Sequence, residues 1–79
     1  MIRDYLDAAL RRAKYTKLED GSYGAEVRGL PGVVATRRTL EACRTELQEV
    51  VEEWVLVRVA RGLSVPSVGG VRIRVRKAG

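Results

Sequence analysis

The longest apolar pattern in the chain runs from Leu40 to Arg61, and neither proline nor glycine interrupts it before Gly62. Its apolar residues recur every three or four positions, as they do on one face of an amphipathic helix. They are Leu40, Cys43, Leu47, Val50, Val51 and Trp54. A helix over residues 40–61 would be about 33 Å long, which is long for a chain of 79 residues. The fold must therefore be arranged around one long helix.

The second half of this predicted helix is apolar on nearly every side. It reads WVLVRVA from Trp54 to Ala60, and its β-branched residues would also suit a strand after Leu56. A small sheet covers only one side of a helix, and surplus apolar surface is typical of an interface. We therefore predict a homo-oligomer, either a symmetric dimer or a dimer of dimers. Its interface would contain Trp54, Val55, Leu56, Val57 and Val59.

The segment before this helix carries the signals of a three-stranded antiparallel meander. Asp20-Gly21 is typical of a hairpin turn. From Tyr23 to Arg28, successive side chains would point to opposite faces of a strand. Pro31 then ends that strand, because proline cannot donate to a sheet, and residues 33–36 predict a third short strand.

The end of the chain alternates between aliphatic and basic residues, which predicts a fourth strand over residues 71–76. Val71, Ile73 and Val75 would face the helices, and the arginines would face water. Two interpretations stay open: a solvated sheet face, or a surface that contacts nucleic acid. The second interpretation would use Arg72, Arg74, Arg76 and Lys77, together with Arg37 and Arg38.

The first residues predict a short amphipathic helix over 2–13, with one apolar stripe. We expect this stripe to pack on the domain's own sheet, although a swapped or partner-binding arm would show the same pattern. The predicted organisation is an N-terminal helix over residues 1–14 followed by the main unit over residues 15–79. Together they would form a single compact α+β domain with the helices on one face of the sheet.

The composition argues against an enzyme. The chain contains no histidine and a single cysteine, Cys43, so the usual general base and the usual metal ligands are missing. We predict no catalytic site, no metal site and no cofactor.

Glu46, Glu49 and Glu53 form an acidic helix face, which is most simply a solvated surface. No apolar segment is long enough to span a bilayer, and we expect a cytoplasmic protein.

The order of several short motifs resembles the HicB-type antitoxin family. The motifs are Asp20-Gly21, Tyr23 with Ala25, Leu30-Pro31-Gly32, Thr39-Leu40-Glu41-Ala42, Trp54, and Gly62 with Val65-Pro66. The resemblance implies a partial ribonuclease H fold, a β-β-β-α-β sheet, to which the N-terminal helix is an addition.

The same resemblance implies a function. HicB-type domains bind and neutralise HicA-type toxins, which cleave messenger RNA, so it implies a toxin as the partner. The acidic face at Glu46, Glu49 and Glu53 would suit a basic toxin. Many family members also carry a C-terminal DNA-binding module, and residues 1–79 show none, so we do not expect DNA binding. The alternative is a small oligomeric protein that binds nucleic acid through its basic C-terminal strand.

Overall fold

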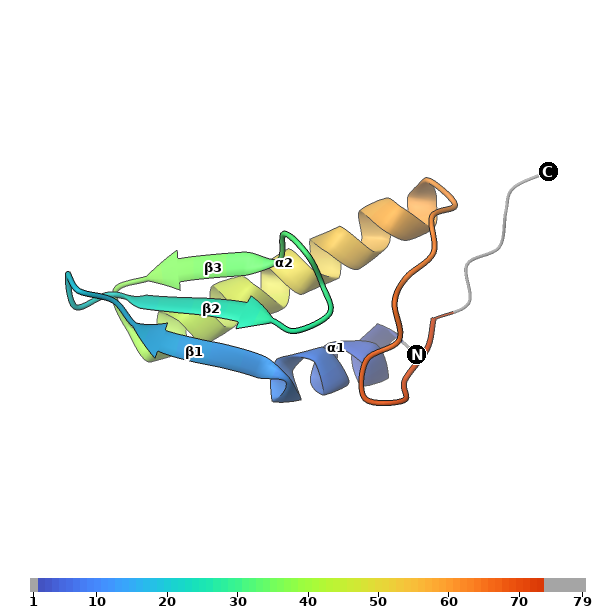
Figure 1. The fold of residues 1–79 in the computed structure, drawn as a ribbon. Helices are drawn as coiled ribbons and strands as arrows, with labels where there is room; N and C mark the ends of the chain where they lie inside the picture. The colour runs from blue at the N-terminus through green and yellow to red at the C-terminus, as the bar shows by residue number, and fades with distance from the viewer. Residues whose placement is uncertain (1, 74–79) are drawn as a thin grey trace.

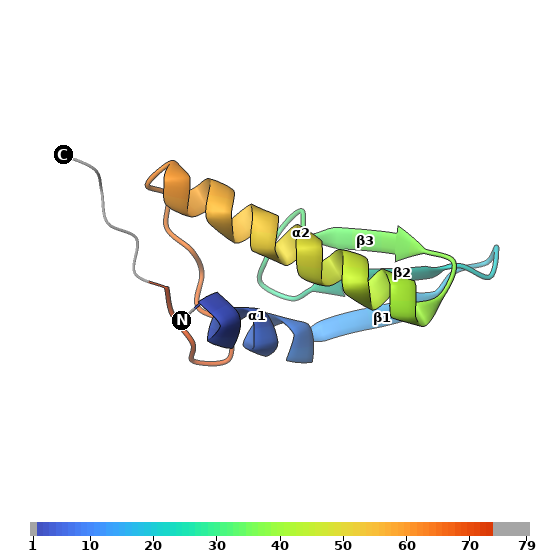
Figure 2. The ribbon, with the colours of Figure 1, turned by 180° about the vertical axis from the view of Figure 1, so that it is seen from behind.

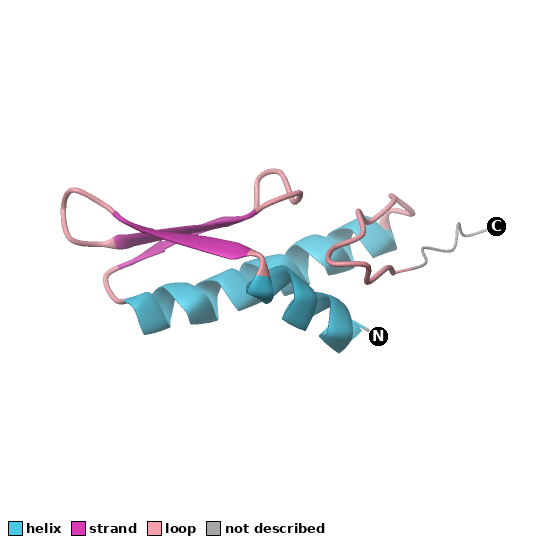
Figure 3. Cartoon of the chain, turned by 60° about the horizontal axis from the view of Figure 1, so that its bottom comes forward, coloured by secondary structure: helices cyan, strands magenta, loops and turns pink. Residues whose placement is uncertain are grey.

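A computed structural model describes residues 2–73 of the chain. Helix α1 (Ile2–Arg11) leads into strands β1 (Ala13–Lys17), β2 (Tyr23–Val27) and β3 (Val34–Arg37), and the long helix α2 (Leu40–Ala60) follows. The strands form one antiparallel sheet in the order β1-β2-β3. Both helices lie on the same side of this sheet (Figures 1 and 3). The predicted α+β class, with the helices on one face, is confirmed.

The turn between β1 and β2 is held by local hydrogen bonds. Asp20 accepts hydrogen bonds from the backbone amide and the hydroxyl of Ser22, and these two bonds hold the pKa of Asp20 below its usual value. Gly21 has a φ of 88°, a conformation that glycine adopts without steric cost. The hairpin predicted from Asp20-Gly21 therefore forms where expected.

Helix α2 has well-defined ends. The Thr39 hydroxyl accepts a hydrogen bond of 3.1 Å from the amide of Ala42, which satisfies one of the unpaired donors at a helix N-terminus. At the other end Gly62 has a φ of 67°, and the Leu63 amide donates to the Arg58 carbonyl at 2.8 Å. This is the pattern of a glycine C-terminal cap. The apolar run after Leu56 is thus helical.

Helix α2 is longer than the sheet that it crosses. Its first half packs against β2 and β3, and its second half projects past the ends of the strands (Figure 2). Strands of 4 to 5 residues reach only about 17 Å, whereas 21 helical residues reach about 31 Å. The projecting half therefore needs a second partner.

Helix α1 is that partner. It packs mainly on α2 and not, as the sequence suggested, on the sheet. The helix also ends at Arg11 and not at residue 13, because Ala13 already pairs with Val27 in the sheet. The chain enters the sheet at this pair. Helix α1, which precedes it, therefore lies beyond the end of the strands and beside the projecting half of α2 (Figure 1).

The core spans both parts of the molecule. Residues from each helix, the sheet and the C-terminal segment contribute buried side chains: Tyr5, Leu6, Ala8, Ala9, Ala25, Val27, Leu30, Val33, Ala35, Cys43, Leu47, Val51, Val55, Val65 and Val68. One row on α2, at spacings of four residues, is completely buried and consists of Cys43, Leu47, Val51 and Val55. This row joins the sheet layer to the α1 layer.

The predicted fourth strand does not form within residues 2–73. Val71 exchanges two hydrogen bonds with Val68, of 3.0 and 2.9 Å, across a turn in which Gly69 and Gly70 both have positive φ. This bridge is isolated from the sheet, because α2 carries the chain past the strands before it turns back. Ile73 still packs partly against the core and Arg72 is exposed, as the alternation predicted. Val75 and the other predicted strand residues from 74 onward lie outside the described residues.

Candidate functional site

The outward face of α2 carries a group of exposed carboxylates. Glu49, Glu52 and Glu53 border a shallow hollow of about 420 Å³ that also contacts Leu56 and Val57. None of these three carboxylates is within ion-pair distance of a cation among residues 2–73. The face therefore presents negative charge next to apolar side chains, a combination that suits a protein partner with a basic surface.

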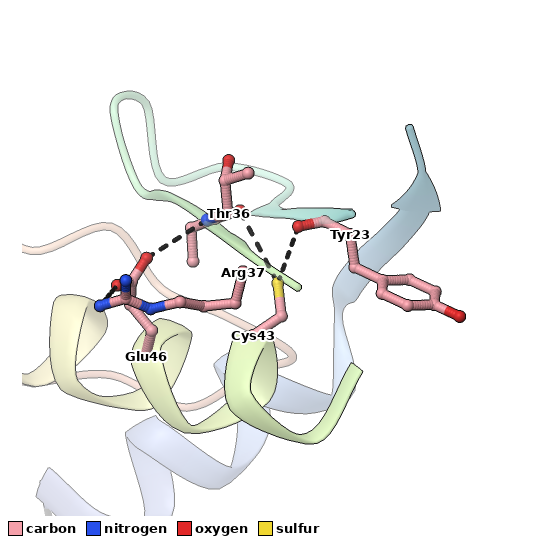
Figure 4. A network of polar contacts seen from close by, with 6 residues as sticks. Tyr23, Thr36, Arg37, Cys43 and Glu46 are labelled. Atoms are coloured by element: carbon pink, nitrogen blue, oxygen red, sulfur yellow. Dashed lines mark hydrogen bonds and ion pairs between the residues drawn. The ribbon is translucent and has the colours of Figure 1, made fainter. Parts of the chain in front are cut away.

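Glu46 is bound within the chain. Its carboxylate pairs with the guanidinium of Arg37 and accepts a hydrogen bond of 3.2 Å from the backbone amide of Thr36 (Figure 4). The side chain thus satisfies a backbone donor on the outer edge of β3, an edge that would otherwise be open to another strand. Of the three glutamates predicted to face a partner, Glu46 instead ties α2 to the sheet.

The five residues of the predicted oligomer interface differ in how far they are exposed. Val55 is completely buried in the chain's own core, whereas Leu56 and Val57 are 48% and 43% exposed. Trp54 and Val59 are half-buried, and the Arg58 guanidinium lies 4.9 Å from the centre of the Trp54 ring. Of the five predicted residues, Leu56 and Val57 are therefore the ones most open to solvent.

The basic C-terminal residues are described only in part. Arg72 is exposed, and Arg74, Arg76 and Lys77 lie outside the described residues. Arg37 is engaged by Glu46, and Arg38 is exposed. The described part of the chain therefore does not assemble the predicted C-terminal basic surface.

A different basic surface, which sequence reasoning missed, lies on the sheet face that the helices leave uncovered. Arg12, Lys14 and Arg28 line a hollow of about 780 Å³ together with Glu26 and the loop that leads into β3. The available signal was the alternation of Arg12 with Lys14 and of Glu26 with Arg28. These residues can be assigned to one surface only when the register of β1 and β2 is known.

Among residues 2–73, no three His, Cys, Asp or Glu side chains are placed to hold a metal ion. The Cys43 thiol is buried and lies 3.5 Å from the carbonyl oxygen of Tyr23 and 3.7 Å from that of Ala35 (Figure 4). It packs as part of the core. No helix within residues 2–73 is long and apolar enough to cross a membrane.

The model of one protein family, described as UPF0150-like, matches residues 4–66, which include all three strands and both helices almost entirely. The chain belongs to this family. The match contains the acidic face of α2 and the basic hollow, and it stops before Arg72. Both surfaces thus lie within the UPF0150-like domain itself.

A solved structure supports the same fold for this UPF0150-like chain. The crystal structure of TTHA0281 from Thermus thermophilus is similar with a TM-score of 0.88 and 38% sequence identity. The similarity covers 96% of this chain and 95% of the other. A search of curated proteins finds no match.

Proposed function

We propose that this UPF0150-like protein is a HicB-type antitoxin, which acts in the cytoplasm by binding and blocking a HicA-type mRNA-cleaving toxin. It would do so as a non-enzymatic binding module without metal or cofactor. The proposal rests on the ordered motifs from Asp20-Gly21 to Val65-Pro66 and on membership of the family over residues 4–66. The three-stranded meander followed by a long helix agrees with the β-β-β-α part of the fold that the resemblance implies.

The observation that carries the proposal is the exposed face of α2. Glu49, Glu52 and Glu53 stand on a helix whose opposite side is buried in the core, so their backbone positions are fixed before a partner arrives. A preformed helix loses little backbone entropy on binding. A messenger-RNA-cleaving toxin must attract polyanionic RNA, so its RNA-binding surface is basic and complementary to these carboxylates.

The test is co-expression with the small protein encoded next to this gene. We expect the two proteins to co-purify and the chain to relieve growth arrest caused by that neighbour. Replacing Glu49 and Glu53 by Lys should weaken the complex by about 10- to 100-fold, because like charges would then face each other. A matched control, Asp7→Lys with Glu19→Lys, makes the same charge change at exposed positions outside the hollow that Glu49, Glu52 and Glu53 border and should leave binding intact. Failure of the wild-type chain to co-purify and to relieve toxicity would overturn the proposal.

The homo-oligomer is part of the same proposal. Leu56 and Val57 are exposed on adjacent positions of α2, and a second copy of the chain in a two-fold arrangement would bury them. Glu49 lies about two turns before Leu56, whereas Glu52 and Glu53 lie one turn before Leu56 and Val57 and line the same hollow. The toxin contact would therefore centre on Glu49 and adjoin the dimer contact.

Light scattering at micromolar concentration measures the assembly. We expect a dimer for the wild type and a monomer for Leu56→Asp with Val57→Asp, because each carboxylate would be desolvated in the contact. Leu40→Asp is the matched control, since Leu40 is 49% exposed on the same helix and lies far from the proposed contact. A monomer mass for the wild type would contradict the proposal.

A further inference from the structure

Four charged residues gather at one end of the uncovered sheet face. Lys14 on β1 pairs in register with Glu26 on β2, and Ala13 pairs with Val27. Arg12 directly precedes β1 and Arg28 directly follows β2, so the two flank the Ala13–Val27 pair at the end of the sheet. Because side chains alternate across a strand, Lys14 and Glu26 lie on the face opposite to buried Val27, and Arg12 and Arg28 line the same hollow as these two.

The cations of this group form no ion pair within the described chain. Among residues 2–73 no carboxylate lies within ion-pair distance of Arg12, Lys14 or Arg28. Of these three cations, Lys14 alone pairs in register with Glu26, so positive charge is in excess around the hollow. A bound anion would reduce the repulsion among these cations.

The hollow between these cations has room for such an anion. Its volume of about 780 Å³ falls within the usual range for ligand sites, about 300–1,000 Å³. The loop from Gly29 to Val34 forms one wall. Gly29 and Gly32 have φ values of 92° and 82°, and open space surrounds the position where a Cβ would stand. A ligand can therefore approach the bare backbone of this wall.

We infer that the hollow binds the phosphodiester backbone of a single-stranded nucleic acid. Three cations with one carboxylate, Glu26, give a net positive site for phosphate. No aromatic residue is among those that line the hollow, so the contact would be to the phosphates, which carry no sequence information, and binding is independent of sequence. This site lies on the opposite side of the sheet from α2, and it does not depend on the proposed toxin contact.

Fluorescence anisotropy with a short labelled oligouridylate tests the inference, with a deoxythymidylate of equal length to distinguish RNA from DNA as the source of the phosphates. Three phosphate contacts predict that affinity falls about 20-fold between about 50 and 200 mM salt, from a slope of about −2 for a single strand. Replacing Arg12, Lys14 and Arg28 by Gln should weaken binding at low salt by at least about tenfold and bring the slope close to zero.

Two controls make the result specific. Gln at Lys17, Arg38 and Arg44 removes the same number and kinds of charge from exposed positions outside the hollow, and this variant should keep most of the affinity. Gln at Arg72, Arg74 and Arg76 should also keep it. Equal loss in the Lys17/Arg38/Arg44 variant, or loss only in the C-terminal variant, would overturn the inference. Equal binding of a polyglutamate of matched length would overturn it too, because the site would then recognise acidic protein.

Thermal unfolding adds a second readout. Because Arg12, Lys14 and Arg28 are exposed and form no ion pair among residues 2–73, the triple variant in the hollow should unfold at about the same temperature as the wild type. The wild type should gain in unfolding temperature when oligouridylate is added, and the variant should not. A variant that binds less because it is less stable would contradict the proposed role of these cations.

Discussion

Replacing Leu47 by Ala should remove most of the stability of this protein. Leu47 is completely buried in the row of α2 that joins the sheet to the rest of the core. Truncating a buried leucine costs its transfer free energy and leaves a cavity, together about 3–5 kcal/mol. A domain of 79 residues has a free energy of unfolding of only about 4–12 kcal/mol. Urea unfolding followed by circular dichroism should show the midpoint falling by about 2 M or more.

Leu40 provides the matched control on the same helix. It is 49% exposed, so Leu40→Ala should change the free energy of unfolding by no more than about 0.5–1 kcal/mol. Alanine is also the best helix former, which offsets part of the lost contact. Equal losses for the two variants would mean that the sheet does not pack on the Leu47 side of α2.

Much of the fold follows from local sequence patterns. The period of the apolar residues from Leu40 to Trp54 located α2, and Thr39 and Gly62 located its ends. Asp20-Gly21 and the alternation after Tyr23 located the hairpin. These features depend on neighbours within a few positions along the chain, which a single sequence displays directly.

The packing of α1 and the path of the residues after α2 depend on the lengths of the strands and of α2, which no local sequence pattern shows. The apolar stripe on α1 has the same sequence pattern whether a sheet or a helix covers it. Its partner is α2 because the strands are too short to cover the whole of that helix. Likewise, the alternation from Val71 suits a strand, but the turn at Gly69-Gly70 pairs Val71 only with Val68 in the described chain.

The candidate surfaces show the same division. The polar helix face that contains Glu49 was expected from the sequence, whereas Leu56 and Val57 belonged to a predicted apolar set in which Val55 is buried. The ion pair of Glu46 with Arg37 and its hydrogen bond from Thr36 could not be predicted, because both depend on the distance between α2 and the edge of β3. The basic hollow could not be predicted without the register of β1 and β2, because Arg12 and Arg28 are far apart in the sequence.

Tyr5 should have the second largest effect, because it anchors α1 to the rest of the molecule. Its ring is completely buried, and its hydroxyl donates to the backbone carbonyl of Pro66 in the C-terminal segment. Tyr5→Ala should cost about 3–5 kcal/mol through the lost ring and the cavity. Tyr5→Phe keeps the ring and should cost about 1–2 kcal/mol, since it leaves the Pro66 carbonyl without its partner. Urea unfolding measures both.

The pH dependence of the free energy of unfolding separates the contribution of the Tyr5 hydroxyl from that of its ring. Burial raises the pKa of Tyr5, and the nearby charge of Arg58 opposes this only in part. The folded protein therefore holds this proton more tightly than the unfolded chain, whose tyrosine pKa is about 10. The resulting stabilisation is fully present below a pH of about 10 and is lost as the pH rises above it towards the folded-state pKa. Tyr5→Phe should remove this part of the alkaline loss of stability.

These variants also decide between the two roles that the sequence left open for the first helix. If α1 is part of the core, Tyr5→Ala lowers the midpoint of the whole unfolding transition, because α1 and α2 share buried residues and unfold together. If α1 is instead an arm that docks on a partner, the same change leaves the main transition in place and makes only the first residues sensitive to protease. Combining urea unfolding with limited proteolysis distinguishes the outcomes. We expect one lowered transition, because the side chains of Tyr5, Val55 and Val65 belong to a single buried cluster.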